Sequence, residues 1–154
     1  MGKSTIQATD VLETVRQLLA QGQTEHALEV LNASNLASSE VENIRGVCML
    51  RLGNVEQATK IFRHLVFRSN VGMDQDAPVE YKINYATALL LSGNLPGCNT
   101  VINEIYDKSH PGLAQLKGGI RKWKQSLSLG QRLTMLIGVQ PSKPVKLDFP
   151  PGIV

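Results

Sequence analysis

Three glycines divide the first two thirds of the chain into units of similar design. Gly22, Gly53 and Gly93 each end an apolar-periodic run, and a small residue stands five positions later in every unit. A larger apolar residue follows four positions after the small one, which gives the pairs Ala27 and Leu31, Ala58 and Phe62, and Cys98 and Ile102. Because glycine accepts the left-handed backbone that closes a helix, this spacing predicts helical hairpins with the small residue at the close contact.

Signals for helix starts agree with this interpretation. Asp10 with Glu13 and Ser39 with Glu42 have the spacing of capping boxes, in which each of the two side chains accepts a backbone N–H at a helix N-terminus. Pro78 suits the first turn of a further helix, where its missing N–H has no intrahelical partner to lose.

The spacing resembles the tetratricopeptide repeat, a helix-turn-helix unit of about 34 residues. The resemblance covers residues 9 to about 107 and is best in the second unit, whose matching residues are Gly46, Met49, Gly53, Ala58 and Phe62. It implies an all-α fold in which antiparallel helical hairpins stack into a short superhelix. We expect the hairpins at about 9–34, 39–68 and 78–107.

The pattern changes after Pro111. An apolar seam recurs there in steps of three and four residues and predicts an amphipathic helix, with Leu113, Leu116, Ile120, Trp123 and Leu127 as its members. A turn at Gly130 and a short partner helix up to Gly138 would complete a capping pair at 111–138. Terminal repeats of such arrays need an outer face of their own, which this capping pair would supply. We expect residues 1–140 to form one domain.

The last segment, residues 141–154, contains four prolines and is expected to be an extended tail. Val145, Leu147 and Phe149 alternate within it, which favours packing of the tail over the helices. A tail on the concave surface of the array would leave no open groove for a partner.

Charge is unevenly distributed along the chain. Residues 1–109 carry nine Lys/Arg and twelve Asp/Glu, whereas residues 110–154 carry seven bases and the single acid Asp148, within a total of +3. The C-terminal part is thus a basic module on a slightly acidic body. The absence of a long apolar stretch predicts no transmembrane segment, and we expect a cytoplasmic protein.

The cysteine and histidine pattern predicts no catalytic, cofactor or metal site. Cys48 and Cys98 lie far apart without a Cys-x-x-Cys motif, which favours buried free thiols. His26, His64 and His110 are widely separated and accompany no recognisable nucleophile. The sequence therefore predicts a protein that is not an enzyme.

The tetratricopeptide resemblance also implies a concave groove lined by the first helix of each pair. The residues at the family's groove positions are Leu12, Arg16, Leu19, Asn43, Val47, Leu50, Ile83, Asn84, Thr87 and Leu90. This mainly aliphatic lining suits an apolar or amphipathic peptide or helix. The alternative is that Leu19, Val47 and Leu90 pack against neighbouring helices or under the tail.

A basic stripe is the second candidate surface. Lys117, Arg121 and Lys124 stand at i, i+4 and i+7 of the expected helix, with Lys122 and Arg132 close by. The stripe could meet phosphates, an acidic partner or an anionic membrane surface, or it is a solvated face. Interleaved aromatic residues for base stacking are missing, which makes nucleic acid the less favoured partner.

The sequence thus predicts a non-catalytic protein-protein interaction adaptor or scaffold. It would bind a peptide or helix in the groove or through the basic C-terminal helix. The alternatives are a module for nucleic acid or another anionic partner that uses the basic stripe, and a small dedicated chaperone. The partner's identity and the oligomeric state are not specified by the sequence.

Overall fold

The computed structural model describes residues 2–67 and 72–154, with residues 2–7 described by their backbone alone. Residue 68, the expected end of the second hairpin, lies outside the described residues. Within them the fold is all-helical, and the eight helices are α1 (Gly2–Ala20), α2 (Thr24–Ala33), α3 (Ser39–Arg51), α4 (Val55–Val66), α5 (Val79–Leu91), α6 (Leu95–Glu104), α7 (Pro111–Gln125) and α8 (Leu129–Leu136).

Tight turns join α1 to α2, α3 to α4 and α5 to α6. Their glycines, Gly22, Gly53 and Gly93, have φ values of 75°, 82° and 84°, as the glycine spacing predicts. The residue after each glycine donates its N–H to a carbonyl five positions back, for example Asn54 to Met49 at 2.8 Å. This bond is the mark of a helix end closed by a left-handed residue, so each turn both stops one helix and starts the next.

The small residues lie at close helix contacts. Ala27, Ala58 and Cys98 are fully buried. A Cβ placed on Gly46 of α3 would lie 2.6 Å from Cε1 of Phe62 on α4, so only glycine leaves room for that ring. The contact between α3 and α4 therefore depends on Gly46 together with Ala58.

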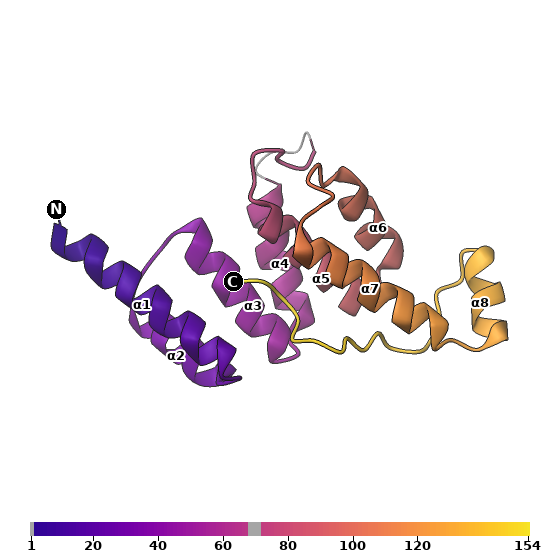
Figure 1. Ribbon diagram of the computed structural model, residues 1–154, viewed down its shortest axis with the longest axis horizontal. Coiled ribbons are helices and arrows are strands. Elements are labelled where there is room, and N and C mark those ends of the chain that lie inside the picture. The colour runs from indigo at the N-terminus through magenta and orange to yellow at the C-terminus, as the bar shows by residue number, and fades with distance from the viewer. Residues whose placement is uncertain (1, 68–71) are drawn as a thin grey trace.

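Two hydrophobic clusters meet at α3. Val15, Leu31, Ile44 and Cys48 belong to the smaller cluster, formed by α1, α2 and one face of α3. Val47 on another face of α3 belongs to the larger cluster, which extends through α4, α5 and α6 to α7. Figure 1 shows the result, with α1 and α2 at one end of the molecule and α7 and α8 towards the other.

Two expected helix starts are wrong in detail. Helix α1 runs without interruption from Gly2, because nothing between residues 3 and 9 breaks a helix, so Asp10 lies inside it and its carbonyl accepts a bond from Thr14 Oγ1 at 2.8 Å. Ser38, one residue before the expected Ser39, caps α3 by accepting the N–H of Val41 at 3.2 Å. Pro78 is the residue immediately before α5.

The turn after α7 also differs from the expectation. Ser128 and Gln131 form a capping box that starts α8, and Gly130 lies inside this helix rather than at the turn. Helix α8 does not close onto α7 as a capping partner. It stands away from the other helices in Figure 1, and the side chains of Leu129, Leu133 and Leu136 are 78%, 64% and 82% exposed.

The C-terminal tail, rather than α8, covers the surface of α7. Residues 137–154 turn back from α8 and run along α7 towards α3, where the chain ends (Figure 1). Val145, Leu147 and Ile153 pack against the larger cluster, which agrees with the packing that alternation in the tail favours. Trp123 donates its indole N–H to the carbonyl of Lys143 at 3.3 Å, and Lys122 pairs with Asp148.

Candidate peptide-binding groove and basic cleft

The centre of the groove is a pair of buried asparagines that hold the tail by its backbone. Asn84 on α5 donates from Nδ2 to the carbonyl of Ile153 at 2.8 Å and accepts the Ile153 N–H on Oδ1 at 2.7 Å. Asn43 on α3 donates from Nδ2 to the same carbonyl at 3.3 Å. Its Oδ1 accepts a hydrogen bond from Nδ2 of Asn84 at 2.9 Å. Both side chains are 4% exposed or less, so these bonds satisfy groups that water does not reach freely.

Arg51, the last residue of α3, extends the contact along the tail. Its guanidinium donates to the carbonyls of Pro151 at 3.1 Å, Gly152 at 3.2 Å and Leu19 at 2.9 Å. Burial lowers the pKa of this group, an effect that the neighbouring Cys48 opposes. All three acceptors are backbone carbonyls and none is a carboxylate. The guanidinium therefore recognises the backbone of the tail and not a particular side chain.

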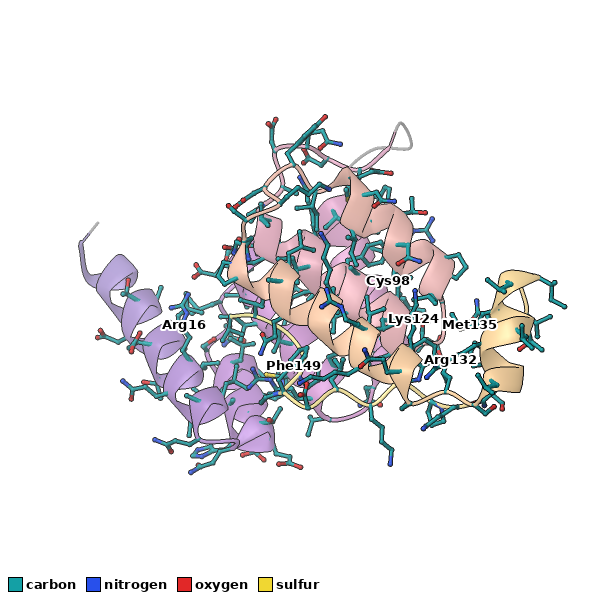
Figure 2. All side chains as sticks on the ribbon, turned by 45° about the vertical axis from the view of Figure 1, so that its right-hand side comes forward. Arg16, Cys98, Lys124, Arg132, Met135 and Phe149 are labelled. Carbon is teal, nitrogen blue, oxygen red and sulfur yellow. The ribbon has the colours of Figure 1, made fainter. Side chains whose placement is uncertain are left out.

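Two glycines allow the tail to approach the helices closely. Gly152 has φ of 89°, and a Cβ there would lie 2.8 Å from Cγ2 of Val47. Gly119 on α7 lies under the tail, where a Cβ would meet Leu147 at 2.9 Å and Phe149 at 3.2 Å. Figure 2 labels Phe149 beside α7. The groove therefore fits an extended segment closely over residues 147–153.

The predicted groove residues divide into three groups. Asn43, Val47 and Asn84 contact the tail, and Leu90 lines a small cavity together with residues 143–145. Leu50, Ile83 and Thr87 are buried in the helical core. The third group comes from α1: Leu12 packs on the smaller cluster, Leu19 is buried in it, and Arg16 forms a salt bridge with Glu40.

The tail therefore fills the groove, and the prediction of a groove that is open to a partner is wrong. Its aliphatic members pack under the chain's own tail or into the core. Arg51 also belongs to the groove, although it is not among the residues that the sequence predicts there. A signal for Arg51 exists, because the corresponding positions of the other two units hold the uncharged residues Ala20 and Leu91.

The basic stripe lines a cleft between α7 and α8. Lys117, Arg121 and Lys124 contribute from α7 and Arg132 from α8, around a volume of about 560 Å³ whose apolar lining is Ile120, Leu127, Met135 and Leu136. Figure 2 labels Lys124, Arg132 and Met135 in this region. The structure thus brings together four of the five predicted basic residues, whereas Lys122 faces the tail.

The cysteines are free, buried thiols. Burial raises the pKa of Cys48 to about 11 and that of Cys98 to about 12, against smaller lowering effects of Arg51 and Lys124. At neutral pH both thiols are therefore protonated and poor nucleophiles.

The histidines lie apart from one another. His26 and His64 are exposed, and His110 Nε2 lies 3.3 Å from Oε1 of Glu80, linking the start of α7 to α5. Among the described residues, no group of three His, Cys, Asp or Glu side chains is placed to hold a metal ion.

In the part of the chain that the structure describes, every helix is too short or too polar to cross a bilayer. Comparisons of the chain with protein-family models, with curated proteins and with solved structures find no significant match.

Proposed function

We propose that the chain is a non-catalytic adaptor of the tetratricopeptide type, whose groove binds an extended peptide segment by its backbone. Its own tail fills the groove until a partner segment displaces it. The glycine turns, the small residues at helix contacts and the seated tail support this proposal.

One observation carries the proposal, namely the two hydrogen bonds between Asn84 and Ile153. A primary amide that pairs with both the N–H and the C=O of one residue recognises extended backbone, whatever the side chain. Removal of the tail would leave Asn43 and Asn84 to bond with water instead of Ile153, so each lost bond to the tail costs about 0.5–1.5 kcal/mol net. The groove therefore favours some extended segment over an empty state.

The tail is a strong competitor for any partner. Because it is tethered, its effective concentration at the groove is in the millimolar range for a short linker. A partner segment must bind more tightly than the tail or arrive when the tail is weakened.

The other two functions receive less support. A dedicated chaperone would need an open groove, which the seated tail does not leave. A module for single-stranded nucleic acid would need aromatic faces for base stacking, and Trp123 is buried with its indole N–H bonded to the carbonyl of Lys143.

The test uses a fluorescent peptide with the sequence of residues 143–154, added to the full chain. Wild type should bind it weakly, and Gly152→Ala, which weakens the chain's own tail and leaves the groove intact, should bind it at least about tenfold more tightly. A peptide methylated on the isoleucine nitrogen lacks the N–H that Asn84 accepts and should lose about tenfold.

The control is Asn84→Ala in the Gly152→Ala background, with folding checked by circular dichroism. This double variant should no longer bind the peptide. Equal affinity of the methylated and unmethylated peptides, or unchanged binding by a folded Asn84→Ala variant, would contradict recognition through the backbone.

A further inference from the structure

The cleft between α7 and α8 has the charge and shape of a second binding site. Lys117, Arg121 and Lys124 lie along one side of α7. Lys117 and Lys124 lie seven positions apart, about 10 Å along the helix at 1.5 Å per residue. The apolar part of its lining consists of Ile120 on α7, Leu127 in the turn after it, and Met135 and Leu136 on α8.

Within the described residues, no carboxylate forms a salt bridge with these three cations. The one acid of the C-terminal part, Asp148, is already paired with Lys122 on a different side of α7. Arg132 donates to the backbone carbonyls of Leu127 and Gln125, so it is fixed at the rim of the cleft without being neutralised. The cleft thus keeps an uncompensated positive charge beside an apolar surface.

The apolar surface continues on α8. Leu136 is 82% exposed, and Ile137 and Val139 beyond the helix are 78% and 52% exposed. Large apolar side chains that gather on an exposed surface are a feature of interaction sites. Polar backbone groups of both helices are satisfied within the helices, so the cleft offers no edge for an added strand.

We propose that this cleft binds an amphipathic acidic helix of a partner protein. Its apolar face would cover Ile120, Met135 and Leu136, and its Asp or Glu side chains, one turn apart, would face Lys117, Arg121 and Lys124. Residues at i, i+4 and i+7 form one stripe on any helix, so a partner stripe of the same period matches the cations. A second copy of this chain is disfavoured as the occupant, because its C-terminal part would bring seven bases and one acid against the same charge.

The test uses two synthetic helical peptides with identical leucine positions, one flanked by glutamates and the other by lysines. The full chain should bind the acidic peptide, with affinity that falls on addition of salt, and should not measurably bind the basic twin. Arg121→Glu should weaken binding about tenfold, whereas Lys146→Glu, an equal charge change outside the cleft, should have little effect.

The apolar part of the site has its own matched pair. Leu136→Ser should weaken the acidic peptide about tenfold, and Leu133→Ser, on the same helix but outside the cleft lining, should not. Both side chains are exposed, so neither change is expected to unfold the chain.

Three results would overturn the assignment. The first is equal binding of the two peptides or no binding of either. The second is association with vesicles of phosphatidylcholine and phosphatidylserine that is lost in Leu136→Ser, which would make an anionic membrane the occupant. The third is a dimer in sedimentation that Leu136→Ser dissociates, which would make a second copy the occupant.

Discussion

Asn84 and Ile153, 69 positions apart in the sequence, exchange two hydrogen bonds that fix the end of the tail on α5. Asn43 supports the same carbonyl from α3. The pair thereby ties the C-terminal tail to the centre of the helical array.

Replacement of Asn84 by alanine should release this end of the tail. The change removes both bonds to Ile153 and the bond to Asn43, and we expect a loss of about 2–3 kcal/mol in the free energy of unfolding. Urea denaturation measures it. Asn103→Ala, at an exposed position of α6, is the control and should change stability by less than about 0.5 kcal/mol. Similar small losses in the two variants would contradict a stabilising role of the hydrogen bonds between Asn84 and Ile153.

Gly152 and Gly138 provide a second matched pair. Their φ values of 89° and 82° impose the same strain on an alanine, about 1 kcal/mol, but a Cβ meets Val47 at Gly152 and open space at Gly138. We therefore expect Gly152→Ala to cost about 1–2 kcal/mol more than Gly138→Ala in thermal or urea unfolding. Limited proteolysis should also cut the tail faster in Gly152→Ala. Equal behaviour of the two variants would contradict the close approach of the tail to α3.

The helical hairpins were accessible from the sequence because they depend on local signals. Gly22, Gly53 and Gly93 end their helices through a backbone property of glycine itself, and the small-residue positions follow from helix periodicity. The orientation of α8 was not accessible, since its leucines suggest a buried partner helix while the tail takes the surface of α7. Asn43 and Asn84 could be placed in the groove, but their ligand lies at Ile153, and no local pattern encodes a contact of that sequence separation.

Ala58 tests the alignment of the second unit. Its side chain is fully buried between helices, so Ala58→Arg forces a long charged group into a close contact and should unfold at least the α3–α4 pair. We expect a loss of more than about 4 kcal/mol, seen as lower helicity and melting temperature in circular dichroism. Ala114→Arg, on the exposed side of α7, should keep wild-type helicity. Wild-type melting of Ala58→Arg would remove the basis of the repeat assignment.

The two buried thiols should make stability fall at alkaline pH. Burial raises the pKa of Cys48 to about 11 and that of Cys98 to about 12, from 9.0 in an exposed thiol. Above pH 9 the unfolded chain loses thiol protons that the folded chain retains. The stabilisation is therefore complete below pH 9 and is lost as pH rises towards the folded values, by at most about 1.4 kcal/mol per pH unit for each thiol.

The measurement compares urea unfolding of wild type with the Cys48→Ala, Cys98→Ala double variant at several pH values from 8 upwards. The difference in pH slope isolates the thiols from other titrating groups. The wild-type slope should be the steeper one, and a thiol reagent at pH 8 should label the cysteines only after unfolding. Rapid labelling of the native chain would contradict the burial of both residues.

Hydrogen exchange at the amide of Ile153 tests most directly whether the groove holds an extended segment by its backbone. This N–H donates to Asn84 Oδ1 at 2.7 Å, so in the wild-type chain it should exchange at least about 100-fold more slowly than the intrinsic rate. The protection should disappear in Asn84→Ala. Exchange of the wild-type Ile153 amide at the intrinsic rate would contradict the account.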